Sequence, residues 1–90
     1  MTSRFEFRSF EKVVLPDELI VNAVTAYVCV QRAEGRAVYD EARGGNKIAE
    51  YIVGMALLKA EYSEFGQAWL KLSADLGFEP AAQELLRLVG

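Results

Sequence analysis

Apolar residues recur every three or four positions along most of this 90-residue chain, which is the spacing of helices that bury one face. From Pro16 onward this spacing predicts about five helical segments joined by short turns. The expected segments are 16 to about 33, 36–43, 47 to about 61, 67–76, and 79 to near the end of the chain, with a break between the first two at 33–35. The predicted fold class is therefore all-α, built from antiparallel helix-hairpin repeats.

The first fifteen residues follow a different pattern. Phe5 and Phe7 alternate with charged side chains, which is the period of an extended chain. Pro16 disfavours helical backbone in the residue before it and so marks a boundary. We therefore expect an extended N-terminal arm over residues 1–15 and a helical repeat domain over residues 16–90. The phenylalanines of the arm are expected either to pack onto the helices or to form a second binding surface.

Small and polar residues mark the expected helix ends. Gly45 and Gly77 should each end a helix, because glycine adopts left-handed backbone without a steric penalty. Asn46 should cap the helix that follows it. Gly54 lies inside a helical segment and predicts a close helix crossing there. Residues 63–66 are expected to connect the third segment to the fourth.

The last two segments carry separate apolar stripes. In the fourth segment, Trp69, Leu72 and Leu76 are expected on one side, with Trp69 in the core. In the last segment, Leu85 and Leu88 form a stripe that has no following helix to cover it. A homodimer would bury this stripe, so we expect self-association as one use of it.

Two parts of the chain resemble a repeat family. Residues 45–54, GNKIAEYIVG, resemble the first-helix signature of Sel1-like repeats, which are relatives of the tetratricopeptide repeat. Five more positions match that family in correct spacing. They correspond to its aromatic pair, alanine, turn glycine and next-helix alanine, and are Trp69, Leu70, Ala74, Gly77 and Ala81. The chain departs from the family in its shorter connection over 59–66 and in Gly66, where the family carries alanine. Over about 45–86, the resemblance implies stacked helical hairpins that bind other proteins.

The side chains that most enzymes use are missing from the sequence. It contains no histidine and a single cysteine, Cys29, whose apolar neighbours lead us to expect it to be buried. It also contains no glycine-rich phosphate loop and no serine nucleophile elbow. Acidic residues occur in pairs, but adjacent residues on a helix do not face one another, which makes poor metal geometry. We therefore predict no enzyme activity, no cofactor and no metal site.

Charge and hydropathy limit the expected partners. The net charge is −3 and the basic residues form no stripe, which disfavours nucleic acid because phosphate binding needs clustered cations. The most apolar stretch, 19–30, is too short to span a bilayer, and the N-terminus shows no signal peptide. We expect a cytoplasmic protein that binds neither nucleic acid nor a membrane.

These observations favour binding of another protein, as an adaptor or a small inhibitor. The expected partner-binding residues lie on the third helical segment and the turn after it, where helical repeats often present their concave side: Tyr51, Met55, Lys59, Tyr62 and Phe65. Aromatic residues are prominent in this set, as they are in binding hot spots. Two alternatives stay open. One is a small-ligand-binding or enzymatic helical domain, with Tyr27 and Cys29 lining a cavity, and the other is a self-associating structural protein.

Overall fold

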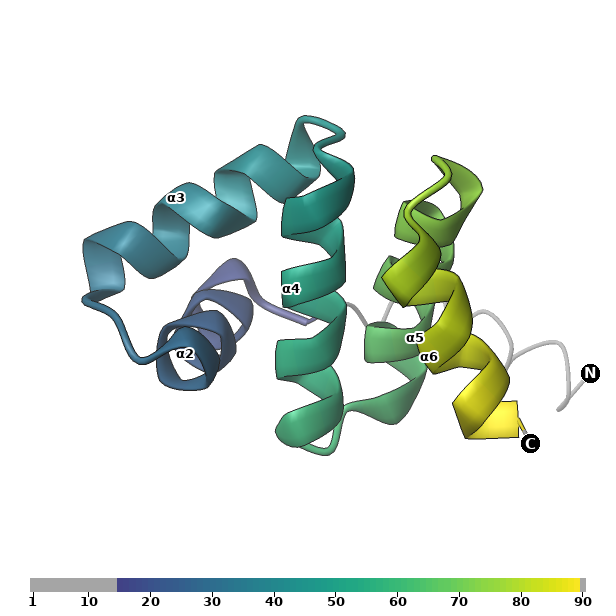
Figure 1. The fold of residues 1–90 in the computed structure, drawn as a ribbon. Helices are drawn as coiled ribbons and strands as arrows, with labels where there is room; N and C mark the ends of the chain where they lie inside the picture. Colours follow the sequence, from purple (N-terminus) through teal and green to yellow (C-terminus); the bar gives the residue numbers. More distant parts are fainter. Residues whose placement is uncertain (1–14, 90) are drawn as a thin grey trace, which may run out of the picture.

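The computed structural model describes residues 15–89, which form five α-helices joined by short turns (Figure 1). The helices are α2 (Asp17–Val28), α3 (Arg32–Arg43), α4 (Lys47–Lys59), α5 (Ser63–Asp75) and α6 (Glu79–Val89). The described residues contain no strand, so the predicted all-α fold class is confirmed. The predicted extended arm lies outside the described residues, except for Leu15.

The helices pack as successive hairpins around α4. Helices α2 and α3 form one hairpin, α4 and α5 form the next, and α6 packs against α5. Helix α4 also contacts α2 and α3, and Figure 1 shows it standing between the α2–α3 pair and the α5–α6 pair. This arrangement places α2, α4 and α6, which alternate along the chain with α3 and α5, on one side of the molecule.

Backbone chemistry accounts for several helix ends that the sequence predicts. The side-chain oxygen of Asn46 accepts a hydrogen bond from the backbone N–H of Ala49 at 3.0 Å, so Asn46 caps α4 as expected. Gly45 and Gly77 have φ angles of 99° and 90°, the left-handed geometry that favours glycine after a helix. Both predicted helix ends are therefore confirmed.

The boundary predicted at residues 33–35 is wrong. Helix α2 already ends at Val28, and α3 begins at Arg32, where the backbone N–H of Gln31 donates to Oε1 of Glu34 at 3.0 Å. Gly35 is buried inside α3, and a Cβ there would overlap Oγ1 of Thr25. Gly35 is therefore explained by the close packing of α3 on α2. In the sequence, such a glycine looks the same as one that ends a helix.

Cys29, which the sequence predicts to be buried, is exposed. It follows the last residue of α2 and adopts left-handed backbone with a φ of 58°. The side chain leaves the apolar face of the helix because the helix ends there. The expectation fails because it assumed a longer first helix.

The connection predicted at residues 63–66 is also wrong, because these residues form the first turn of α5. Gly66 instead meets Gly54 of α4. A Cβ on Gly54 would lie 2.9 Å from the carbonyl oxygen of Gly66, and a Cβ on Gly66 would lie 2.8 Å from that of Gly54. The close crossing predicted at Gly54 is confirmed, and Gly66 is its partner.

The core lies between α2, α3, α4 and α5 and reaches the first turn of α6. Its buried apolar residues are Ile20, Val21, Val24, Tyr39, Ala42, Ala49, Val53, Ala56, Leu57, Leu70 and Ala81. In α5 the buried residues are Gly66, Leu70 and Ser73, and the Ser73 hydroxyl donates to the carbonyl oxygen of Lys47 at 2.7 Å. This bond holds α5 against the start of α4.

The apolar stripe predicted on the fourth helical segment is only partly buried. Leu72 and Leu76 are 49% and 52% exposed. Trp69 is half-buried against the core, with its ring 6.2 Å from that of Tyr39 in an edge-to-face arrangement. Close packing of α5 on α4 requires small residues, so the buried face carries less apolar bulk than the outer one.

The stripe predicted on the last helical segment is only partly covered. Leu85 is half-buried and Leu88 is 40% exposed, whereas Ala81 is buried at the start of α6. The homodimer expected from this stripe stays a prediction.

Candidate protein-binding groove

Two neighbouring pockets lie on the side of the molecule formed by α2, α4 and α6. The pocket between α2 and α4 has a volume of about 330 Å³ and is lined by Ala23, Ala26, Tyr27, Ala56, Lys59 and Ala60. The pocket that extends to α6 has a volume of about 340 Å³ and is lined by Tyr27, Met55, Leu58, Lys59, Glu84, Arg87 and Leu88. Tyr27 and Lys59 line both pockets. The residues of the two pockets together form one continuous surface, which we call the α2/α4/α6 groove.

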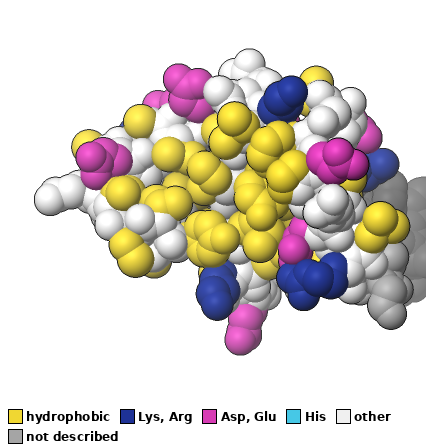
Figure 2. Space-filling view, viewed as in Figure 1, with side chains coloured by type: hydrophobic (Ala, Val, Ile, Leu, Met, Phe, Trp, Pro, Cys, Tyr) yellow, Lys and Arg dark blue, Asp and Glu magenta, His cyan; other side chains and the backbone are white. Residues whose placement is uncertain are grey.

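The groove is apolar in its middle and charged at its edge. Figure 2 shows an apolar area crossing the centre of this side of the molecule, with basic side chains along its lower border. Three alanines of α2 and α4, together with Ala60 directly after α4, keep the first pocket open, because a methyl group fills little of the space between two helices. Both pockets are open to solvent, whereas a small-ligand site normally encloses most of its ligand. The open shape therefore favours a protein side chain or a peptide segment over an enclosed small molecule as the occupant.

Side chains from three helices converge at Tyr27 in the middle of the groove. Burial is the main cause that raises the pKa of Tyr27, and electrostatic repulsion from Tyr51 and Glu84 adds to it. Tyr51 lies on α4 and packs edge-to-face against Phe78, with ring centroids 5.3 Å apart. Tyr27 therefore offers the groove both an aromatic surface and a hydroxyl group.

The charged edge of the groove carries an excess of positive charge. Nε of Arg87 donates to Oε1 of Glu84 at 3.3 Å, so these two charges pair within α6. Lys59 is exposed at the end of α4, and no ion pair among the described residues includes it. The groove thus presents one cation that the described part of the protein does not neutralise.

The structure places two of the five predicted site residues in the groove. Tyr51, Met55 and Lys59 follow one another at intervals of four residues on α4, and of these Met55 and Lys59 line the groove. Tyr62 and Phe65 lie at the start of α5, where they pack partly against the core and line another pocket. The predicted strip is therefore divided between two places on the surface.

The groove also contains residues that were not among the predicted partner-binding residues. Ala23, Ala26 and Tyr27 come from α2, and Glu84 and Arg87 come from α6. The broad apolar surface of the first helical segment was the one available signal for the α2 side. Of the two residues suggested for a cavity, Tyr27 lines the groove, whereas Cys29 is not among its lining residues.

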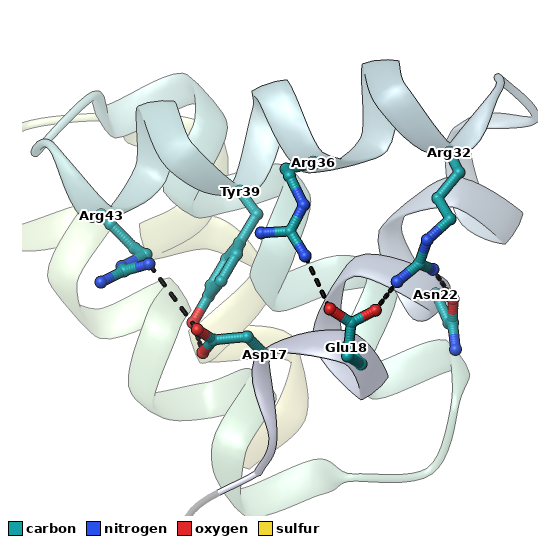
Figure 3. Close-up of polar contacts among 7 residues, drawn as sticks. All are labelled: Asp17, Glu18, Asn22, Arg32, Arg36, Tyr39 and Arg43. Carbon is teal, nitrogen blue, oxygen red and sulfur yellow. Dashed lines mark hydrogen bonds and ion pairs between the residues drawn. The ribbon is translucent and has the colours of Figure 1, made fainter.

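A second polar cluster joins α2 to α3 and has a structural character. Figure 3 shows that carboxylates of α2 point toward cations and a tyrosine of α3. The cluster consists of Asp17, Glu18, Asn22, Arg32, Arg36, Tyr39 and Arg43. Glu18 pairs with both Arg32 and Arg36, the latter at 2.8 Å. The Tyr39 hydroxyl donates to Oδ1 of Asp17 at 2.8 Å.

The basic residues of this cluster are largely neutralised by the two carboxylates. Arg43 also lies 3.7 Å from Oδ2 of Asp17, and its guanidinium stands over the ring of Tyr39. All three arginines of α3 therefore have an acidic partner on α2, and their charges exceed those of the two carboxylates by one. The arrangement fixes the angle between the two helices rather than presenting a reactive group.

One buried acid lies outside both polar regions. Glu50, in the first turn of α4, is 5% exposed, and its Oε1 has no hydrogen-bond partner among the described residues. Burial raises the pKa of its carboxyl group. Within residues 15–89, no group of three or more acidic, histidine or cysteine side chains gathers closely enough to hold a metal ion.

None of the helices described in residues 15–89 has the length and apolar character needed to cross a bilayer. Comparison of the chain with models of known protein families, with curated proteins and with solved structures found no match. The groove is therefore interpreted from its own geometry and chemistry.

Proposed function

We propose that this protein is a protein–protein interaction module, acting as an adaptor or a small inhibitor. Its partner places a peptide segment in the α2/α4/α6 groove. The observation that carries the proposal is that two open, mostly apolar pockets join into one groove across three helices. Helix-in-groove and extended-peptide recognition both use such surfaces, with apolar side chains in the pockets and polar groups at the edge.

The helical hairpins and the signature at residues 45–54 support a Sel1-like or tetratricopeptide-like architecture for this module. In such stacks the alternate helices form one continuous surface, because each hairpin packs against the next in the same way. The groove on α2, α4 and α6 is consistent with that arrangement.

A pair of matched substitutions tests the proposal. Ala26→Arg places a long charged side chain in the pocket between α2 and α4, and Ala33→Arg makes the same change on exposed α3, outside the groove. Tagged wild type and both variants would be used in pull-downs from lysate of the native cells, read by quantitative mass spectrometry. A partner retained by wild type and Ala33→Arg but lost with Ala26→Arg is the expected result. A partner set that Ala26→Arg leaves unchanged would refute binding in this groove.

A further inference from the structure

We infer that the segment bound in the α2/α4/α6 groove is an acidic one, with an apolar side chain in a pocket and a neighbouring carboxylate paired with Lys59. This inference rests on the proposed function and adds the chemistry of the partner. It depends on charge complementarity between the groove edge and the bound segment.

The charge balance of the groove supports an acidic partner. The whole chain has a net charge of −3, yet the groove edge carries two cations, Lys59 and Arg87, and one anion, Glu84. Glu84 and Arg87 neutralise each other within α6, and the side chain of Glu84 is only 12% exposed. Among residues 15–89, no ion pair includes Lys59, so this part of the chain leaves one positive charge at the groove edge, which favours acidic over basic segments.

The position of Lys59 makes it available to a segment in either pocket. It is the last residue of α4 and lines both pockets, so its exposed side chain borders each of them. Beside it, Ala56 and Ala60 leave space for an apolar side chain of the partner. A carboxylate that reaches Lys59 over this apolar surface is less exposed to water than one at an open surface, and its ion pair is correspondingly stronger.

A nucleic acid fits this groove less well than an acidic peptide does. Binding to a phosphate backbone normally engages several cations at once, and its affinity comes mainly from them. Within the described part of the chain, one cation of the groove is left without an ion pair, and the remaining lining is mostly apolar. An isolated positive charge beside apolar pockets matches a peptide that combines one acidic with one large apolar side chain.

Selection from a random displayed peptide library tests the inference directly. Three forms of the protein serve as bait: wild type, Lys59→Glu, and Lys71→Glu as a control with the same charge change on the exposed surface of α5. We expect wild type and Lys71→Glu to enrich peptides in which an acidic residue lies next to a large apolar one. Lys59→Glu should lose this preference, and its dissociation constant for a synthesised wild-type peptide should rise about tenfold.

Two other results would overturn the inference, and they differ in what they mean for the proposed function. In the first, the enriched peptides lack acidic residues or bind Lys59→Glu as well as wild type, but they do not bind Ala26→Arg. The groove would then be a peptide-binding site without the proposed preference for acidic segments. If Ala26→Arg, used as a fourth bait, binds every enriched peptide as well as wild type does, or if no peptide is enriched, both conclusions would be overturned. Circular dichroism of each variant confirms that the substituted proteins are folded.

Discussion

Three glycines set how closely the helices of this protein approach one another. Gly35 brings α3 onto Thr25 of α2, while Gly54 and Gly66 bring the backbones of α4 and α5 together. At each of these positions a side chain would overlap an atom of the neighbouring helix. The usual helix-weakening effect of glycine, about 1 kcal/mol relative to alanine, is outweighed by the packing that its absent side chain permits.

Gly35→Ala tests this role of glycine. The new Cβ would overlap Oγ1 of Thr25 and lie 3.2 Å from its Cα, so α2 and α3 would have to separate. We expect a net loss of about 1–3 kcal/mol in the free energy of unfolding, as for other overpacked cores. Urea denaturation followed by circular dichroism measures it. Gly44→Ala is the control, since its Cβ would lie 3.5 Å from the nearest atom, and its effect should stay within about 0.5 kcal/mol.

Glu50 should make the stability of the protein depend on pH. Burial raises the pKa of its carboxyl group above the ordinary value of 4.5, so the folded protein binds this proton more tightly than the unfolded chain. The contribution of Glu50 to stability is therefore fully present below pH 4.5 and is lost as the pH rises through the folded pKa.

Glu50→Gln removes this titration. As the pH rises from about 4.5, the free energy of unfolding of the variant should increase relative to that of wild type. The difference should become constant above the pKa of Glu50 in the folded protein. Chemical denaturation of both proteins at a series of pH values measures this difference. A difference that does not change with pH over this range would show that Glu50 is not buried as a neutral acid.

The number of helices and several of their ends could be predicted because they depend on local chemistry. Asn46, Gly45 and Gly77 act on the backbone of their own turn, so a sequence pattern identifies them without knowledge of packing. The faces of the helices could not be predicted as well. The buried face of α5 uses Gly66 and Ser73, whose small size is favourable only against a helix that the sequence does not locate.

The contacts between α2 and α3 should differ in strength according to their exposure. Tyr39 is buried and donates to Asp17, so Tyr39→Phe should reduce the free energy of unfolding by about 1 kcal/mol. Glu18 is 63% exposed despite its two arginine partners, and Glu18→Gln should cost less than about 1 kcal/mol. Denaturation of both variants at low and high salt separates the two effects. Only the Glu18→Gln effect should shrink with added salt.

The groove shows why a binding site made by several helices is hard to predict from sequence. Met55 and Lys59 could be predicted because they share one face of a single helix. Tyr27 and Glu84 come from helices before and after α4, and their proximity depends on the angles that the turns and the close crossings impose. Tyr62 and Phe65 follow the third helical segment in sequence, which predicts the same surface for them, but the start of α5 brings them to another pocket.

The helices should differ in how readily they open. Helix α4 packs against α2, α3 and α5, whereas α6 makes its main contacts with α5. We expect the backbone amides in the middle of α4 to exchange most slowly with solvent deuterium and those of α6 to exchange fastest among the helices. Hydrogen-exchange mass spectrometry with short peptides resolves this order. Equal protection of α4 and α6 would mean that the five helices unfold only as a unit.

The attachment of α6 mainly through α5 has a consequence for recognition. One wall of the groove belongs to the helix with the fewest neighbours, and a ligand that spans the groove would contact this wall together with α2 and α4. Occupancy of the groove and the order of α6 are then thermodynamically linked. A ligand at a concentration one hundred times its dissociation constant would stabilise the bound arrangement by about 2.7 kcal/mol. The bound segment would add a structural neighbour to α6 beyond its described contacts with α5, and partners would be distinguished partly by how well they hold this helix in place.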